Sequence, residues 1–375
     1  MRPVHDLAIL GGGPAGIACA LRAADQGASV LLCDPQTGPF DKPCGEGILP
    51  AGAQVLRELG IEPEGAARPF AGIRYCVPGA GDVSMNFDAP GEAWWRTDLH
   101  AALTNALGRR PGVQRVMLRA DAAPEAGLFR IHAGNQDFHA RYLVAADGAG
   151  GRAAGWLRPA SSSQARHRVG GRARFAETRP LDRVEVHFGG GLDVYLTPLP
   201  HGAINVVVLA DARPGALPDA AALIEAGLSR HPRAQACLGQ QIGHAESRRL
   251  GLPWPKRLTD GRAFLIGDAG GAVDPILGAG MTIALRTGGQ AADAVAAILR
   301  GARPESVARQ FSCAGRSERR ARRILAEGLQ LVSRHDFLAR QLARSLRLVP
   351  SLGNRLAAIA AGRVAVPLEP LPAGA

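Results

Sequence analysis

Two glycine-rich segments, far apart in a chain of 375 residues, have the composition of phosphate-binding turns. The first is Gly11–Gly16, which reads GGGPAG and follows the apolar run Leu7–Leu10. The second is Gly267–Gly271, which reads GDAGG and follows Phe264–Ile266. A glycine turn between a buried strand and a helix lets the backbone approach a pyrophosphate, and the helix N-terminus supplies free N–H groups. Together the two segments predict the site of one long dinucleotide, and they favour FAD over NAD.

Each position of the first segment has its own expected task. Gly11 permits the tight turn, Gly13 lets the backbone approach the pyrophosphate, and Gly16 lets the helix pack against the strand. Pro14 and Ala15 open that helix. We therefore expect all five residues to contribute to nucleotide binding.

Each glycine segment is associated with an aspartate that can accept a hydrogen bond from a hydroxyl group of the nucleotide. Asp34 lies 18 residues beyond Gly16, where its carboxylate can accept both ribose hydroxyls and disfavours a 2′-phosphate, so NADP is not the expected resident nucleotide. Asp268 directly follows Gly267 and can accept a hydroxyl of the ribityl chain. The N-terminus of a helix over 281–299 would face the pyrimidine end of the flavin and stabilise its anionic reduced form. The loop before that helix contains Gly278, Ala279, Gly280 and Met281.

The elements that must position these residues alternate in type. The pattern predicts a strand over 5–10, a helix over 14–26 and a strand over 29–33, which is the opening βαβ unit of a dinucleotide fold. A helix over 97–110 and a buried strand over 142–146 follow. In the middle of the chain, apolar and polar residues alternate between short glycine and proline turns, which is typical of an antiparallel sheet.

We therefore expect an α/β protein with a Rossmann-like FAD-binding domain of the glutathione-reductase type. Its antiparallel-sheet substrate domain is inserted, and its C-terminal region is helical. The expected ranges are 1–72, 96–160 and 260–303 for the FAD-binding domain, 73–95 and 161–259 for the substrate domain, and 304–375 for the helical region.

Composition narrows the class of protein. A 46% apolar and 21% charged content is that of an ordinary globular protein, and no apolar run of transmembrane length or signal peptide is visible. We expect a cytoplasmic location, with peripheral contact at the inner membrane surface as an alternative. Six cysteines without CxxC spacing predict neither a metal site nor a disulfide framework. The +11 net charge rests almost wholly on arginine, as in proteins from GC-rich genomes, and no nucleic-acid-binding module is apparent.

The C-terminal region carries arginines at helical spacing. Arg316, Arg319, Arg320 and Arg323 are expected to form one stripe. The apolar side chains expected mostly on another face are Ile324, Leu325, Leu329 and Val332. A solvated helix that covers the core explains this pattern. The alternative is contact with a membrane surface or an anionic substrate.

Further motifs occur in the order found in a known flavoprotein superfamily. They are Gly11–Gly16, Asp41–Gly47, Trp95–Leu99 around Arg96, Asp147–Gly148 and Gly267–Asp268. The chain thus resembles the superfamily of p-hydroxybenzoate-hydroxylase-type monooxygenases, geranylgeranyl reductases and FAD-dependent halogenases, over residues 5 to about 300. Residues 41–50, 73–75 and Arg96 particularly resemble single-component oxidoreductases encoded beside type III polyketide synthases, which are described as monooxygenases.

The resemblance implies roles for these motifs in binding non-covalent FAD. Arg96 would contact the FAD phosphates or ribityl chain, and Lys42 would be a surface or phosphate contact. Asp147 and Gly148 belong to a motif linked to both FAD and reduced pyridine nucleotide. No second GxGxxG follows a strand, so NAD(P)H would visit only transiently. The residues implied to line the flavin ring are Cys44, Gly45, Glu46 and Gly47, of which Cys44 can also be a small space-filler.

The leading hypothesis is an NAD(P)H-driven monooxygenase. It would use O2 and a C4a-hydroperoxyflavin to hydroxylate a lipophilic aromatic compound, such as a phenol or alkylresorcinol. His187, Tyr195 and His201 are the candidate catalytic bases. The alternative is a reductase or dehydrogenase of the geranylgeranyl reductase type, acting on a prenyl chain or alkene. The halogenase Trp-x-Trp-x-Ile-Pro signature is missing, and the protein could be a monomer or a homodimer.

Overall fold

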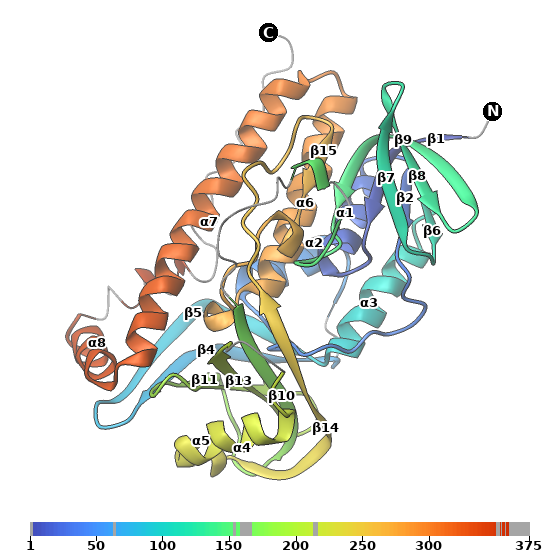
Figure 1. Cartoon of the computed structure of the whole chain (residues 1–375). Coiled ribbons are helices and arrows are strands. Elements are labelled where there is room, and N and C mark those ends of the chain that lie inside the picture. The colour runs from blue at the N-terminus through green and yellow to red at the C-terminus, as the bar shows by residue number, and fades with distance from the viewer. Residues whose placement is uncertain are drawn as a thin grey trace.

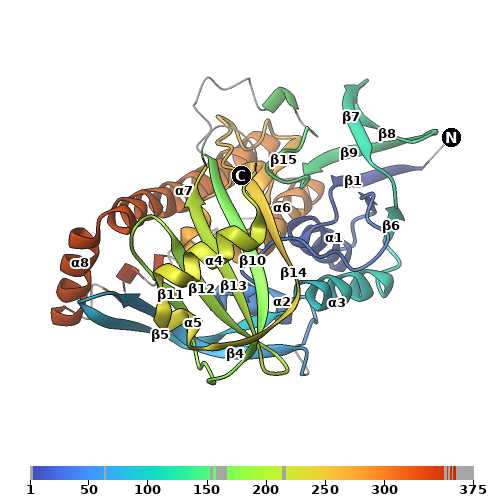
Figure 2. The ribbon, with the colours of Figure 1, turned by 60° about the horizontal axis from the view of Figure 1, so that its bottom comes forward.

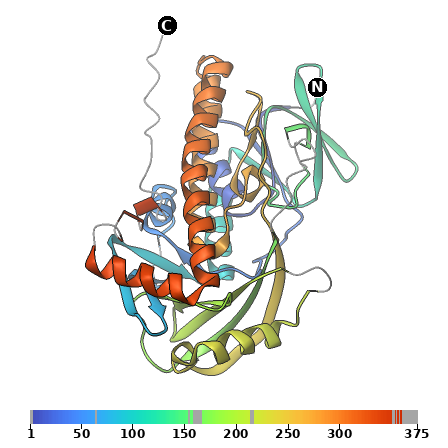
Figure 3. The ribbon, with the colours of Figure 1, turned by 60° about the vertical axis from the view of Figure 1, so that its left-hand side comes forward.

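The computed structural model describes residues 3–62, 65–152, 155–157, 167–212 and 217–349, with 353, 355, 356, 358 and 359. Its strands form two sheets, one near each end of the molecule (Figure 1). The long helix α7 (Pro304–Arg334) runs beside α6 (Gly280–Leu299), and α8 (Asp336–Leu348) crosses its far end beside the second sheet (Figures 1 and 3).

The first sheet has strand order β6-β2-β1-β9-β8-β7, and β15 pairs with β9. Its central strands are parallel and buried, because each ends a β-to-α or α-to-β crossover that places helices over the sheet. Helices α1 and α6 pack together against it. The strands are β1 (Val4–Leu10), β2 (Val30–Cys33), β6 (Val113–Val116), β7 (Ala120–Glu125), β8 (Leu128–Ala133), β9 (Gln136–Ala145) and β15 (Ala263–Leu265). The helices around it are α1 (Pro14–Asp25), α2 (Pro50–Glu58), α3 (Arg96–Gly108) and α6.

The second sheet has eight strands in the order β14-β10-β13-β12-β11-β4-β5-β3. Neighbouring strands are antiparallel except β11 and β4, which are parallel. The expectation of a wholly antiparallel sheet is wrong at this pair, because β4 and β11 are joined through the first sheet and not by a hairpin. The strands are β3 (Gly47–Ile48), β4 (Ala67–Val77), β5 (Gly81–Trp94), β10 (His167–Glu177), β11 (Val184–His187), β12 (Asp193–Leu199), β13 (Ala203–Asp211) and β14 (Leu238–Gly251).

Both faces of the second sheet are covered. Helices α4 (Ala220–Arg230) and α5 (Pro232–Gln235) lie across its outer face (Figure 2). The inner face packs against the short 3-10 turn η3 (Pro275–Leu277) and against α6, α7 and α8. Side chains alternate between these two cores along each strand, so Val186 belongs to the inner core and Val206 to the outer one.

The α/β fold with two sheets and a helical C-terminal region confirms the predicted fold class. The predicted domain division stays a prediction, although the second sheet takes β4 from Ala67 onward and β3 at Gly47–Ile48, ahead of residue 73. Of the predicted helical range 304–375, residues 350–352 and nearly all that follow lie outside the described residues.

Candidate functional site

The first glycine segment forms a tight turn between β1 and α1. Gly11 has φ +113°, and a Cβ there would lie 2.4 Å from the carbonyl oxygen of Ala146. A Cβ on Gly16 would lie 1.9 Å from the carbonyl oxygen of Gly11. No described atom lies within 4 Å of the place a Cβ on Gly13 would take. Two glycines are thus required by packing, whereas Gly13 leaves an open space in front of the α1 N-terminus.

Asp34, at the end of β2, faces this turn. Its carboxylate accepts hydrogen bonds from the backbone N–H of Gly12 and, at 2.7 Å, from that of Gln36. These bonds fix the orientation of the carboxylate at the place where a nucleotide ribose would lie.

A cavity of about 300 Å³ opens in front of the glycine turn. Segments from both ends of the first sheet and from α3 surround it, which brings together residues more than 130 positions apart. The predicted residues that line it are Gly11, Gly13, Asp34, Lys42, Arg96, Asp147 and Gly148, and further lining residues include Gln36, Phe40, His100, Arg119, Asp121 and Arg152.

Two cations share this cavity. Arg96 is 2% exposed, and its Nε is buried without a hydrogen-bond partner among the described residues. Lys42 lies close enough that burial first, and the charge of Arg96 second, lower the pKa of its ammonium group. A buried guanidinium nitrogen and a neighbouring ammonium group favour an anionic ligand between them.

The second glycine segment lies directly beside the first. A Cβ on Gly267 would lie 3.0 Å from the Cβ of Ala15 in α1, and the Gly267 N–H donates to Thr287 Oγ1 at 2.9 Å. The neighbouring Asp268 is exposed, and its carboxylate raises the pKa of the Lys42 ammonium group against the stronger lowering by burial. The two segments therefore lie at one site, as their composition predicts.

The loop before α6 reaches the same site. Arg96 Nη1 donates to the Met281 sulfur at 3.7 Å, and Ala279 is buried at the start of the helix. Gly278 has φ +61°, and the Cβ positions of Gly278 and Gly280 have no described atom within 4 Å. These two glycines leave an open surface at the N-terminus of α6, where the flavin ring is expected.

The segment from Cys44 to Gly47 forms the opposite side of this surface. The carbonyl oxygen of Cys44 accepts from Asn205 Nδ2 at 2.9 Å, and the Cβ position of Gly45 is open. Glu46 is different, because its carboxylate is 1% exposed and accepts from Arg174 and from the Arg96 backbone N–H. Glu46 thus joins β10 of the second sheet to the start of α3, and its implied place at the flavin ring stays a prediction.

These observations fit FAD. The open Gly13 position and the unpartnered Arg96 Nε suit a pyrophosphate, and Asp34 suits a ribose. The open backbone at Gly45, Gly278 and Gly280 suits a flat ring. Arg96, Lys42 and the α1 N-terminus would hold the phosphates, and the α6 N-terminus would face the ring.

Tyr195 and His201, two candidate bases, have other roles. The Tyr195 hydroxyl donates to the carbonyl oxygen of Ile276 at 2.9 Å, and burial raises its pKa well above 10. Tyr195 therefore supports the η3 turn. His201 is exposed in the β12–β13 turn with φ +62°.

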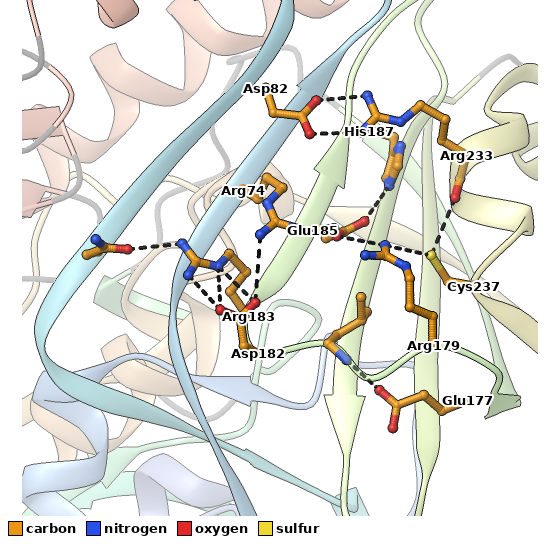
Figure 4. A network of polar contacts seen from close by, with 12 residues as sticks. Arg74, Asp82, Glu177, Arg179, Asp182, Arg183, Glu185, His187, Arg233 and Cys237 are labelled. Carbon is orange, nitrogen blue, oxygen red and sulfur yellow. Dashed lines mark hydrogen bonds and ion pairs between the residues drawn. The ribbon is translucent and has the colours of Figure 1, made fainter.

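His187, the third candidate base, lies on the outer face of the second sheet. Its Nε2 is 3.2 Å from Glu185 Oε2 (Figure 4). Its ring packs 6.0 Å from that of His231 beside α5. Because Val186 and Phe188 take the inner face, the alternation of the strand turns His187 away from the flavin surface. His187 is withdrawn as a catalytic base.

Cys76, Glu185 and His187 have ligand atoms within 4.8 Å of one another. Burial opposes the ionisation of Glu185, but the hydrogen bond from His187 and the nearby guanidinium of Arg179 outweigh it and lower the pKa to about 2. Arg74 also donates to Glu185 at 2.9 Å (Figure 4). Burial raises the pKa of the Cys76 thiol to about 12. Two guanidinium groups and a protonated thiol make this cluster a poor metal site, and the expectation of no metal stays a prediction.

Sequence reasoning missed two side chains of the inner face. Arg174 reaches from β10 to Glu46 and to Asp41, and its guanidinium lies 4.7 Å from the Trp95 ring. Asn205 on β13 keeps its Oδ1 buried without a partner among the described residues. The sequence shows the period-two pattern of the strands that carry them. It does not show their contacts, because the residues that they bond lie more than 120 positions away in the sequence.

A second cavity, of about 40 Å³, lies on the inner face between β4, β5, α7 and α8. Leu277, which immediately precedes the Gly278 loop, lines it. Tyr75 supplies the one polar side chain among the described lining residues, and the rest are Val77, Val83, Met85, Phe188, Leu277, Leu325, Leu329, Val332, Ala339, Leu342, Ala343, Leu346 and Leu356. The wall beside the flavin surface is therefore apolar.

The site combines a dinucleotide-binding turn with a second glycine segment beside it, and a separate sheet lies over an apolar wall. This combination defines an FAD-dependent oxidoreductase. Residues 5–171 match the family model described as FAD binding domain. This match and the named relatives support the flavoprotein superfamily expected from the sequence, and the chain is an FAD-dependent enzyme.

Relatives of known name include both reductases and a hydroxylase. The chain is 29% identical over 319 residues to a menaquinone reductase of Mycobacterium tuberculosis, covering 77% of this chain and 76% of that protein. It is 28% identical over 321 residues to digeranylgeranylglycerophospholipid reductase 1 of Methanothermobacter thermautotrophicus, covering 78% and 77%. It is 27% identical over 320 residues to the ubiquinone hydroxylase UbiL of Rhodospirillum rubrum, covering 76% and 70%.

The fold is shared with solved flavoenzymes. The p-nitrophenol 4-monooxygenase PnpA of Pseudomonas putida superposes with a TM-score of 0.78 at 18% identity, covering 96% of each chain. At 18% sequence identity this structural similarity shows a shared fold and nothing more. The resemblance to oxidoreductases encoded beside polyketide synthases stays a prediction.

Proposed function

We propose that this enzyme is an FAD-dependent reductase of a carbon–carbon double bond in a lipophilic, isoprenoid-type substrate. The observation that carries the proposal is the apolar wall from Leu277 to Phe188 beside the open α6 N-terminus. His187 faces away from that wall and the Tyr195 hydroxyl is already hydrogen-bonded, so neither offers a free base there for phenol hydroxylation. This reverses the order of the two hypotheses drawn from the sequence.

The residues present have distinct tasks in such a reaction. FAD, when bound and reduced, would supply a hydride to one alkene carbon, and the other carbon would take its proton from solvent. The α6 N-terminus beyond Gly280 stabilises negative charge on the flavin ring, and Arg96 and Lys42 hold the phosphates. The apolar side chains around Leu277 exclude water and align the alkene by burial. Tyr195 keeps the η3 turn in place through its bond to Ile276. NAD(P)H is the proposed electron donor.

The names of two relatives support a lipophilic substrate. Menaquinone and digeranylgeranylglycerophospholipid both carry long apolar chains, and both relatives are named as reductases. Hydroxylation of a lipophilic ring is the second candidate, because the relative from Rhodospirillum rubrum is named as a hydroxylase of ubiquinone.

The decisive experiment compares products with and without oxygen. The FAD-loaded enzyme is reduced with NADPH or dithionite under anaerobic conditions and offered prenylated quinones and geranylgeranyl lipids. A product that is still heavier by two hydrogens after any quinol has been re-oxidised in air supports the reductase. A product that appears only in air and is heavier by one oxygen overturns it in favour of hydroxylation.

A variant tests the apolar wall itself. Phe188 is 3% exposed and stacks on Tyr75 with ring centroids 5.5 Å apart. Phe188→Ala should raise KM for a long-chain substrate about tenfold or more, and much less for a short-chain analogue, because it removes apolar contact area. Phe129→Ala, a buried change in the first sheet, is the matched control for lost stability. Equal KM changes for the two chain lengths would contradict the assignment of this wall.

A further inference from the structure

The helices α7 and α8 expose large apolar side chains where they meet. We call this the elbow surface, and it consists of the exposed residues of 320–349. Phe337 is 68% exposed, Leu348 is 83% exposed and Ile324 is 62% exposed. Leu331, Leu338 and Val349 are also exposed, so six of the eleven large exposed apolar side chains among the described residues lie here. Such clustering marks an interaction surface.

The outward face of α8 is defined by its packing. Ala339, Ala343 and Leu346 are buried against the inner core of the second sheet. Phe337 and Leu348 are eleven residues apart and therefore lie on the same, opposite side of the helix. This side faces away from the sheet at the end of α7 (Figures 1 and 3).

Two arginines fix α8 in this orientation. Arg340 Nε donates to the carbonyl oxygen of Pro78 at 3.1 Å, and Arg347 Nη1 donates to that of Ala80 at 2.9 Å. Both carbonyls belong to the turn between β4 and β5. These two hydrogen bonds hold α8 in the orientation that leaves its apolar side exposed.

Basic residues are interleaved with the apolar ones. Arg344 is exposed between Phe337 and Leu348, and Arg320 is exposed one turn before Ile324. The acid of α8, Asp336, lies 3.4 Å from Arg230, and Glu327 of α7 pairs with Arg323 at 3.0 Å. The elbow surface therefore presents an excess of positive charge among its apolar side chains.

The expected stripe of arginines on α7 is corrected by the structure. Arg319 is 6% exposed, and its guanidinium lies 5.1 Å from the Trp254 ring. Burial lowers its pKa to about 10. Ile324, expected on the apolar face, is instead exposed. The outward face of α7 is consequently mixed basic and apolar, and not purely basic.

We infer that the elbow surface docks on an anionic lipid bilayer. Interleaved arginine and large apolar side chains on helices that lie flat on the molecule are the composition of interfacial helices, whose apolar side enters the acyl boundary while basic groups contact lipid phosphates. None of the described helices is long and apolar enough to cross a membrane, so contact occurs at the surface. Charge complementarity selects a bilayer over a second copy of this chain, which carries the same positive charge.

The position of the elbow surface also suits a lipophilic substrate. Ala339, Ala343 and Leu346, on the buried side of α8, line the apolar cavity beside Leu277. A substrate leaving the bilayer at this elbow would reach that cavity directly. This last link rests on the proposed function, whereas bilayer docking does not.

Flotation with vesicles tests the docking. The full chain, loaded with FAD, is mixed with vesicles of phosphatidylcholine containing 30% phosphatidylglycerol, or of phosphatidylcholine alone. We expect binding to the anionic vesicles and at least about tenfold weaker binding to the neutral ones. The double variant Phe337→Ser, Leu348→Ser should lose about tenfold or more of the affinity, and Arg344→Gln about fivefold.

Matched surface changes serve as controls. Ile242→Ser alters a side chain of β14 that is 42% exposed at the opposite edge of the second sheet. Arg130→Gln alters a half-exposed arginine of β8. Both should bind vesicles like the unchanged protein, and all variants should retain bound flavin.

Four results would overturn the inference. Three of them come from the vesicle assay. They are absence of binding to anionic vesicles, equal binding to neutral vesicles, and undiminished binding by the Phe337, Leu348 double variant. A lipid-free dimer that this double variant converts to monomer would also overturn it and identify a second copy as the occupant. Failure of the reductase assay with intact vesicle binding would overturn the proposed function alone.

Discussion

Gly13 and Gly16 are three residues apart in one turn but experience opposite surroundings. The Cβ of an alanine at position 16 would meet the Gly11 carbonyl oxygen at 1.9 Å, whereas at position 13 it would meet no described atom within 4 Å. Gly13 also has φ −74°, which any residue can adopt. One glycine is therefore required by the fold, and the other is free to serve a ligand.

This difference predicts separate effects of two matched variants. Gly16→Ala should destabilise the protein by about 1–3 kcal/mol or more, because the backbone must shift. Gly13→Ala should cost under about 1 kcal/mol in the FAD-free protein but weaken FAD binding about tenfold or more, because its methyl group enters the space of the pyrophosphate. Denaturant unfolding and flavin fluorescence titration measure the two quantities. If Gly13→Ala bound FAD normally, the pyrophosphate would have to lie elsewhere.

At the scale of elements, the η3 turn depends on a buried polar cluster. Asp274 accepts from the Ile276 N–H at 3.0 Å and from Gln330 of α7. Asp193 of β12 accepts from Ser333 of α7 and, at 3.3 Å, from Arg168. The cluster joins β12, η3 and α7 immediately before the Gly278 loop, so it holds the flavin surface against both the sheet and the long helix.

The titration of Asp193 gives this cluster a pH dependence. Its side chain is fully buried, and this burial raises the pKa to about 6 despite the opposing bonds from Ser333 and Arg168. Between pH 4 and 6 the folded protein therefore binds more protons at this group than the unfolded chain does. The contribution of Asp193 to the unfolding free energy falls as pH rises through that window, by about 3 kcal/mol at most.

Asp193→Asn should remove that slope. Relative to the unchanged protein, the variant should gain unfolding free energy as pH rises from 4 to 6. Above pH 6 the difference between the two proteins should stay constant. Urea unfolding at several pH values measures it. Asp182→Asn, an exposed carboxylate with a lowered pKa, is the control and should not reproduce the trend. A difference that is constant from pH 4 to 7 would show that Asp193 ionises normally.

The sequence predicts elements better than it predicts their faces. Period-two alternation through 184–188 indicates a strand, and β11 confirms it at Val184–His187. The alternation cannot tell which side meets the flavin, because both faces of the second sheet are covered by helices and both carry buried residues. The pattern therefore could not show that His187, a candidate base, lies on the outer face. The glycine turns, whose function depends on local backbone, were recognised from their spacing alone.

At the scale of the whole molecule, one largely buried arginine connects the second sheet to the start of α3, one of the helices around the first sheet. Arg174 of β10 donates to Glu46 and to Asp41 in the segment that leads out of the nucleotide-binding unit. Glu46 in turn accepts from the backbone N–H of Arg96 at 2.8 Å, where α3 begins. The position of β10, the start of α3 and the placement of the cavity cation Arg96 therefore depend on one ionic contact, which no local sequence pattern reveals.

Removing Arg174 should thus affect both stability and cofactor binding. Arg174→Met leaves Glu46 buried without its charge partner, and we expect a loss of about 3–5 kcal/mol in unfolding free energy together with weaker FAD binding. Adding Glu46→Gln should restore part of the stability, because the uncompensated charge is gone. Arg233→Met is the control: its pair with Asp82 is 65% exposed at the arginine, so the loss should stay below about 1 kcal/mol. Denaturant unfolding and flavin titration of the four proteins measure these effects. If Arg174→Met cost no more than Arg233→Met, the Glu46 contact would not hold β10 to the start of α3, and Arg96 would have to be positioned by the packing of α3 alone.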